Sequence, residues 1–278
     1  MDAQENSESP ITRAVDHAFL NAGFIIKVAE DLGRELYQKC TPEEQNYYDA
    51  FIKIPDEDSA QQICQKTVGQ DNGDWDEARF GRITGSISYP LYTYYKNKHS
   101  DSDWQNKLIG TYDSSFRGND DTDRGLESEI KAKVCYEEAK GNVKVENVGI
   151  LINPAVPWLG YSADGIVHVS GKIGRLWEVK TPVKGATNGA STICEVLPYM
   201  KKENKLKEKH RYYGQVQLGM LLWSLPFCDF TVYCYKPNQV YIDPVPFNEK
   251  FCLEFVKILT KVYFERVLPW LVSQKNDS

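Results

Sequence analysis

Four short apolar runs between residues 143 and 180 constrain the fold more than any other feature of this sequence. They cover about 143–152, 158–161, 165–169 and 175–180, and turn-forming residues separate them, as expected for strands. Helical patterns lie on either side, at about 124–140 and 207–225, and a further strand pair at 230–235 and 240–245 precedes a long amphipathic helix at 247–271. This order predicts an α/β core in which helices flank a central mixed sheet.

The first 70 residues have a different character, because they read as helices without strands. One helix is expected from about Thr12 to Cys40. Thr41-Pro42-Glu43-Glu44 and Pro55-Asp56-Glu57-Asp58 each combine a capping residue with an acidic first turn, and so indicate two further helix starts. The turn-rich segment 69–74 then predicts a boundary, with an N-terminal helical extension at 1–70 and a second domain at 71–278.

Composition excludes several classes of protein. The 278 residues are 41% hydrophobic and 26% charged, and no apolar run approaches the roughly 20 residues that a membrane span requires. The N-terminus resembles neither a secretory signal nor a transit peptide, and the seven cysteines contain no CxxC pair, so we expect an intracellular protein with reduced thiols. A net charge of −6 argues against a basic nucleic-acid coat but is compatible with a site built from carboxylates.

The chemistry is concentrated on two neighbouring strands. Asp164-Gly165 forms a turn before one strand, and Glu178-Val179-Lys180 ends the next. Side chains alternate along a strand, so Glu178 and Lys180 project from one face while Val179 points into a core. An Asp-Gly turn or a Glu-x-Lys strand is common by itself, but the two joined by a short hairpin are a much more specific combination.

This arrangement suits a hard divalent cation such as Mg²⁺, which prefers oxygen ligands. Asp164, Glu178 and the carbonyl of Val179 form a suitable set. A metal there would polarise a phosphate and lower the pKa of an attacking water, and Lys180 could position that water.

Three further segments surround this motif. They are Ala78-Arg79-Phe80-Gly81-Arg82-Ile83-Thr84-Gly85-Ser86, the helix start Gly125-Leu126-Glu127-Ser128-Glu129, and Tyr212-Tyr213-Gly214-Gln215-Val216-Gln217. With Asp164 and Glu178-Val179-Lys180, they resemble the PD-(D/E)XK nucleases, and among these the lambda-exonuclease or YqaJ-type viral recombinase branch. Ala163 stands where that motif has Pro, a residue that supplies no ligand. The resemblance spans residues 79–222.

The resemblance implies a restriction-endonuclease-like core and roles for five more residues. Glu129 becomes a carboxylate of the metal site, and Gln215 helps to complete the active site. Arg79, Ser86 and Ser162 would hold the 5′-phosphate of DNA, a role that fits the way guanidinium and hydroxyl groups bind phosphate oxygens. Gln217 is then structural. Arg82 is expected at the surface, and the four histidines carry no catalytic role.

The implied activity is metal-dependent hydrolysis of DNA, with Mg²⁺ as cofactor and Mn²⁺ as a substitute. A 5′-to-3′ exonuclease on double-stranded ends with a 5′-phosphate is expected, with a place in DNA recombination and repair and a homotrimer as the assembly. Two alternatives stay open: a structure-specific or nicking endonuclease, and a catalytically silent nucleic-acid-binding protein. The Lys-rich segment 184–210 is either a surface loop or the lining of a DNA channel.

Overall fold

The strands form two sheets. The computed structural model describes residues 9–112, 120–182, 189, 192, 195, 197–201 and 203–276. A five-stranded sheet has the order β2-β5-β6-β7-β8, and a three-stranded sheet has the order β1-β4-β3. The strands are β1 (Ile83–Thr84), β2 (Val143–Glu146), β3 (Ile150–Leu151), β4 (Leu159–Ser162), β5 (Gly165–Val169), β6 (Lys172–Lys180), β7 (Phe227–Cys234) and β8 (Gln239–Pro246).

The five-stranded sheet is mixed, as predicted. A tight hairpin joins β5 and β6 antiparallel, and its turn residues Ser170 and Gly171 both have positive φ, the backbone conformation that such two-residue turns require. β6 and β7 are parallel, so the chain between them must cross over the sheet, and it does so through α10 (Arg211–Leu222). The expected α/β core with a central mixed sheet is confirmed.

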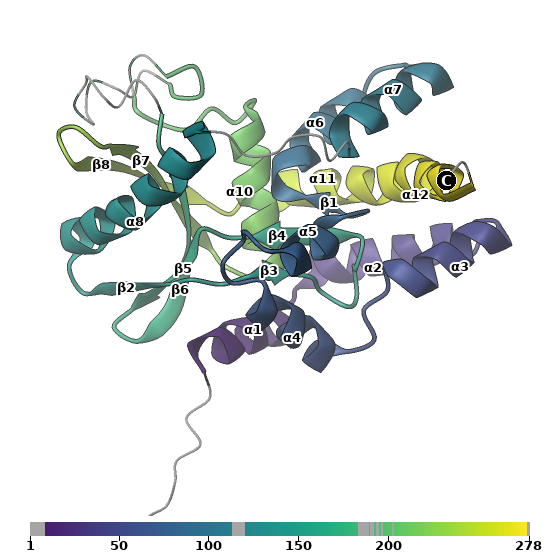
Figure 1. Cartoon of the computed structure of the whole chain (residues 1–278), viewed down its shortest axis with the longest axis horizontal. Helices are drawn as coiled ribbons and strands as arrows, with labels where there is room; N and C mark the ends of the chain where they lie inside the picture. Colours follow the sequence, from purple (N-terminus) through teal and green to yellow (C-terminus); the bar gives the residue numbers. More distant parts are fainter. Residues whose placement is uncertain are drawn as a thin grey trace, which may run out of the picture.

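Helices cover both faces of this sheet (Figure 1). On one face, α8 (Asp120–Lys140) packs Ala132 and Tyr136 against Trp177 and Val179, in a small apolar cluster. On the other face, α10 contacts β6 and β7 and joins the main core of the protein. Successive side chains of β6 therefore point alternately toward α8 and toward α10, as the alternation of side chains along a strand requires.

The remaining helices in the described part of the chain lie at the centre, below the centre and on the right of the molecule in Figure 1. In chain order they are α1 (Pro10–Leu20), α2 (Phe24–Tyr37), α3 (Pro42–Phe51), α4 (Glu57–Lys66), α5 (Gly73–Arg79), α6 (Gly85–Tyr95), α7 (Asp101–Tyr112), α11 (Glu249–Val262) and α12 (Leu268–Asn276), with a π-helical turn η2 (Tyr263–Val267) between the last two. No helix in the described ranges is both long and apolar enough to cross a membrane.

The expected single helix over 12–40 is wrong, because the chain turns at residues 21–23. The Asn21 side chain donates to the carbonyl of His17 at 2.8 Å, and Gly23, the residue before α2, has an extended conformation. A short polar side chain competing for the last carbonyls ends a helix in this way. The predicted start at Thr41 is confirmed by a capping box with Glu44.

The N-terminal helices share the main core with the rest of the chain. Val15 of α1, Ile26 of α2 and Cys64 of α4 are buried in the same apolar cluster as Ile150 and Phe255. Contacts between α2 and α11 and between α4 and β3 link the first 70 residues to later segments. The division at residue 70 stays a prediction.

Candidate active site

The two predicted acidic residues lie at the adjoining ends of β5 and β6. Asp164 directly precedes β5, and Gly165 pairs with Trp177, so β6 continues past the start of its neighbour. The Oδ2 atom of Asp164 accepts a 2.7 Å hydrogen bond from the backbone N–H of Val179. Asp164 is thereby fixed beside the segment that carries Glu178.

Glu178 is the centre of the site and is 1% exposed. Its Oε1 atom accepts hydrogen bonds from Lys180 Nζ at 2.5 Å and from Gln215 Nε2 at 2.6 Å. Its Oε2 atom accepts one from the hydroxyl of Tyr161 at 2.7 Å. A buried carboxylate is tolerated only when such donors match its charge and lone pairs. The structure thus brings Lys180 and Gln215 together on Glu178.

Glu129 belongs to the same electrostatic group. Burial raises the pKa of its carboxyl, and the negative charge of Glu178 adds to this while Lys180 opposes it. Burial likewise raises the pKa of Asp164 well above its usual range, reinforced by Glu178 and Glu129 and opposed by Lys180 and the Val179 N–H. Three carboxyl groups therefore share one lysine, and negative charge is in excess.

Lys180 keeps its proton in this setting. Burial lowers the pKa of its ammonium group, but the carboxylates of Glu178 and Asp164 outweigh that effect, and the net pKa is raised. The ammonium also lies 5.0 Å from the centre of the Tyr212 ring, within reach of a cation–π contact. Lys180 therefore acts as a charged hydrogen-bond donor when no metal is bound.

The donor chemistry at this site fits a hard cation. Within the residues that the structure describes, no three His, Cys, Asp or Glu side chains are gathered into a complete metal site. Asp164 and Glu178 nevertheless supply two carboxylates at the adjoining ends of β5 and β6, and Glu129 is close enough to influence both. Oxygen donors with excess negative charge suit Mg²⁺ or Mn²⁺.

The predicted phosphate ligands Arg79 and Ser162 are joined through Trp75. The guanidinium of Arg79 lies 3.9 Å from the centre of the Trp75 ring, and the indole N–H of Trp75 donates to Ser162 Oγ at 2.8 Å. Ser162 ends β4, two residues before Asp164. The Trp75 side chain thus contacts both the guanidinium of Arg79 and the hydroxyl of Ser162, beside the acidic site.

Ser86 approaches the site from another direction. It is exposed in the first turn of α6, and β1, which leads into that helix, runs parallel to β4. The preceding residue, Gly85, packs against the ring of Tyr161 and the side chain of Gln215. The start of α6, with its unpaired backbone N–H groups, therefore lies next to the residues that hold Glu178.

Comparison with known proteins shows the family of the chain. The family model of the YqaJ-like viral recombinase domain matches residues 74–222, slightly more than half of the chain. The chain belongs to this family. The match includes every predicted site residue, from Arg79 to Gln215. No curated protein matches the chain in sequence.

Solved structures share the fold of this YqaJ-like chain. An alkaline exonuclease (LHK-Exo) from Laribacter hongkongensis is 19% identical, with a TM-score of 0.53 over 74% of this chain and 99% of the exonuclease. The same enzyme in complex with dAMP is 21% identical over the same shares, also with a TM-score of 0.53. The SOX protein of KSHV, in an RNA complex, is 12% identical, with a TM-score of 0.51 over 100% of this chain and 93% of SOX.

Three residues near the site were not foreseen from the sequence. Tyr161 and Trp75 hold Glu178 and Ser162, as described above. Gln70 donates through Nε2 to the carbonyls of Ala163, at 2.7 Å, and of Val148, at 3.1 Å, and so fixes the backbone next to Asp164. Their positions were the only hint in the sequence: Tyr161 lies within a recognised motif, and Trp75 lies just before another.

The expectation that Arg82 lies at the surface is wrong. Its side chain is buried and donates to the carbonyls of Pro157, Ile52 and Ala78 at 2.8–3.0 Å. Five fixed donors let a guanidinium tie several chain segments together where no carboxylate is present. Arg82 therefore connects the N-terminal helices to the family domain.

The contacts of Gln217 support the prediction that this residue has a structural role. It is fully buried, donates to the carbonyl of Pro246 and accepts from the N–H of Asn248.

In the Lys-rich segment, Lys205 pairs with Asp243 and Lys207 donates to the carbonyl of Pro198. Residues 184–188, 190, 191, 193, 194, 196 and 202 of that segment lie outside the described residues, so its role in a DNA channel stays a prediction.

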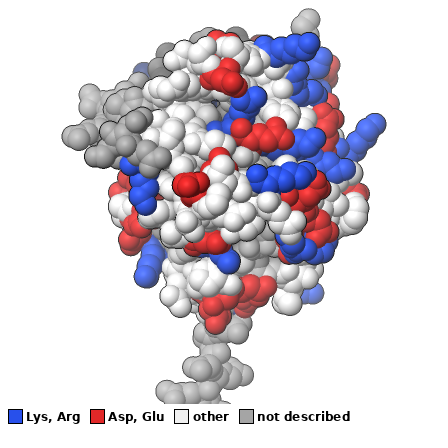
Figure 2. Space-filling view, turned by 90° about the vertical axis from the view of Figure 1, so that its right-hand side faces the viewer, with Lys and Arg blue, Asp and Glu red and all other residues white. Residues whose placement is uncertain are grey.

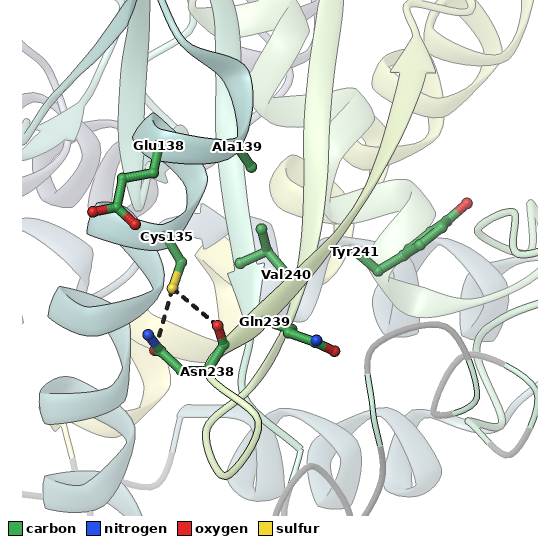
Figure 3. A pocket seen from close by; sticks show the side chains of 7 residues that line it. All are labelled: Cys135, Glu138, Ala139, Asn238, Gln239, Val240 and Tyr241. Atoms are coloured by element: carbon green, nitrogen blue, oxygen red, sulfur yellow. Dashed lines mark hydrogen bonds between the residues drawn. The ribbon is translucent and has the colours of Figure 1, made fainter.

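Two other surface features lie apart from this chemistry. A pocket between α8 and the β7–β8 hairpin is lined mainly by Cys135, Glu138, Asn238 and Tyr241, with the Cys135 thiol donating to Asn238 (Figure 3). None of the predicted site residues lines it. Figure 2 shows a face where basic and acidic side chains alternate without forming a continuous basic track.

Proposed function

We propose that the protein is a metal-dependent DNA nuclease, acting as a 5′-to-3′ exonuclease on double-stranded ends. The observation that carries this proposal is the buried Glu178, bonded to Lys180 and placed beside Asp164 on adjoining strands. Excess carboxylate charge around one lysine favours binding of a divalent cation and, with it, of a phosphodiester. The shared fold with an alkaline exonuclease solved with dAMP supports the same reading.

Asp164, Glu178 and the Val179 carbonyl would hold the metal, with Glu129 supporting it directly or through water. A bound Mg²⁺ or Mn²⁺ would polarise the scissile phosphate and make a bound water more acidic. Lys180 holds a proton at Nζ and would donate a hydrogen bond to the attacking water or to a phosphate oxygen. Gln215, freed from Glu178, would orient the same water.

Arg79, Ser162 and Ser86 would recognise the end of the DNA substrate. Arg79 offers a guanidinium fixed by stacking, and Ser162 and Ser86 offer hydroxyls, which together suit a terminal 5′-phosphate. Recognition of a terminal phosphate by these groups would favour exonuclease action over internal cutting. DNA with a double-stranded, 5′-phosphorylated end is therefore the proposed partner.

The decisive experiment is digestion of a linear duplex labelled at one 5′ end, with Mg²⁺, comparing the wild type with Lys180→Ala. We expect progressive release of mononucleotides that the variant loses by about 10³-fold or more. Lys140→Ala is a matched control, because Lys140 also pairs with a buried carboxylate, that of Asp229. Nicking of circular DNA would support the endonuclease alternative. Metal-dependent DNA binding without cleavage would support a binding protein.

The assembly is tested separately. A homotrimer, expected from the family, would give a mass in light scattering of three times the 31.8 kDa of one chain. A monomer mass with processive digestion would show that trimer formation is not needed for the activity.

A further inference from the structure

Tyr161 is the most deeply buried polar neighbour of the proposed active site. It lies in β4, its side chain is 0% exposed, and its hydroxyl donates to Glu178 Oε2 at 2.7 Å. A buried phenol hydroxyl that lacks a hydrogen-bond partner costs free energy. Here that partner is the carboxylate at the centre of the site.

The ring of Tyr161 is fixed by a glycine on each side. A Cβ atom at Gly85, the first residue of α6, would come within 2.7 Å of the ring, and one at Gly219 in α10 would come within 2.5 Å of Cζ, the carbon that carries the hydroxyl. Both distances are too short for any side chain. The two helices therefore contact the ring directly, and it cannot move without displacing one of them.

The donors on Glu178 are divided between its two oxygen atoms. Oε1 accepts from Lys180 and Gln215, which are both partly exposed, so these donors can turn toward an incoming ligand. Oε2 accepts from Tyr161, which is enclosed. The Tyr161 bond is therefore the one expected to persist when the other two donors exchange partners.

We propose that Tyr161 is a positioning residue that fixes Glu178 through Oε2 and keeps Oε1 directed toward the metal and the attacking water. This inference rests on the proposed nuclease function. Tyr161 does not touch the substrate in this account, and it acts through Glu178. Hydrogen-bond partners behind a metal ligand set the ligand's orientation, and their loss commonly weakens metal binding about 10-fold to 100-fold.

The chain offers a matched control on the opposite face of the same sheet. Tyr136 is also 0% exposed, and its hydroxyl also donates to a buried carboxylate, Asp229 Oδ2, at 2.7 Å. Tyr136→Phe and Tyr161→Phe therefore remove the same atom from two equally buried phenols. Only the second removal affects a proposed metal ligand.

The test measures the affinity of the full-length protein for Mn²⁺ by titration calorimetry, alongside cleavage kinetics and thermal unfolding. For Tyr161→Phe we expect Mn²⁺ affinity to fall about tenfold. The kcat should fall with it, while KM for DNA stays within about twofold, because the phosphate ligands are untouched. Tyr136→Phe should leave Mn²⁺ affinity within about twofold of wild type.

Unchanged Mn²⁺ affinity in Tyr161→Phe, or an equal loss in both variants, would overturn the inference and leave the proposed function standing. A wild-type protein that neither binds Mn²⁺ nor cleaves DNA would overturn both. If Tyr161→Phe does not fold, a fluorinated tyrosine at position 161 takes its place, because it keeps the ring and the hydroxyl and changes the strength of the hydrogen bond to Glu178. We then expect a Mn²⁺ affinity different from that of the wild type, and an unchanged one would overturn the inference.

Discussion

Two buried carboxylates on neighbouring strands, Glu178 in β6 and Asp229 in β7, face opposite sides of the same sheet. Each is at most 1% exposed, and each accepts a 2.7 Å hydrogen bond from a buried tyrosine. Asp229 is also paired with two cations, Lys140 at 2.9 Å and Arg175 at 3.1 Å. Among the described residues, Glu178 pairs with one cation, Lys180, and the neighbouring carboxyl groups of Asp164 and Glu129 add negative charge.

The difference lies in the balance of charge. Around Asp229 the positive charges exceed the negative one, and the network ties α8, β6 and β7 together as a structural unit. Around Glu178 the carboxyls of Asp164 and Glu129 add negative charge that Lys180 cannot neutralise. We therefore propose that similar burial serves the stability of the protein on one face and the binding of a cation on the other.

The largest expected effect comes from Glu178→Gln. This change removes a proposed metal ligand and its charge, so the rate of duplex cleavage should fall by about 10³-fold or more. The folded state should be nearly unaffected or slightly more stable, because repulsion with Asp164 and Glu129 is relieved. Initial rates and thermal unfolding measure the two effects. Activity within tenfold of wild type would remove Glu178 from the site.

Asp229→Asn should show the opposite pattern. Removing one partner of a buried ionic network leaves Lys140 and Arg175 poorly matched, at a cost of about 3 kcal/mol in the free energy of unfolding. Urea denaturation measures this loss. Cleavage per folded molecule should stay within a few-fold of wild type. A large loss of cleavage with unchanged stability would show that the two faces are not separate in function.

Mg²⁺ should stabilise the protein, and more strongly at higher pH. The pKa of Asp164 is raised in the folded state, so the stability it contributes is present below the usual carboxyl pKa and is lost as the pH rises through the folded value. Bound metal offsets that loss. At 100 times its Kd, Mg²⁺ should add about 2.7 kcal/mol near pH 8, seen as a rise in Tm of several degrees. The rise should be smaller near pH 5 and small at both pH values in Asp164→Asn.

The smallest effect is expected from Trp75→Phe. The substituted ring can still support Arg79, but the hydrogen bond to Ser162 is lost. We expect the ratio of rates on 5′-phosphorylated and 5′-hydroxyl duplexes to fall by about threefold to tenfold, with Mn²⁺ affinity unchanged. An unchanged ratio would show that Trp75 has no part in recognising the 5′-phosphate. The active site would then consist of the carboxylate residues and their partners alone.

Much of the fold and of the site was predictable from local patterns. Strand alternation put Glu178 and Lys180 on one face, and the Ser170-Gly171 turn set the pairing of β5 with β6. The split of 143–152 into β2 and β3, which belong to different sheets, was not predictable, because a continuous apolar run does not show which strand each half will meet.

The contacts that complete the site come from residues distant in sequence. Tyr161 reaches Glu178 across 17 positions, and Trp75 reaches Ser162 across 87. Arg82 looked like a surface residue because a charged side chain is rarely buried without a carboxylate, yet three backbone carbonyls surround it. Local periodicity contains no information about such partners.

The close fit of Tyr161 between Gly85 and Gly219 has an evolutionary consequence. A relative with a small residue in place of Tyr161 would leave a hole between the two helices, and side chains at the positions of the glycines could fill it. A relative that keeps the aromatic ring cannot accept them. The three positions should therefore change together among homologues, as one compensating unit, while the acidic residues around them stay fixed.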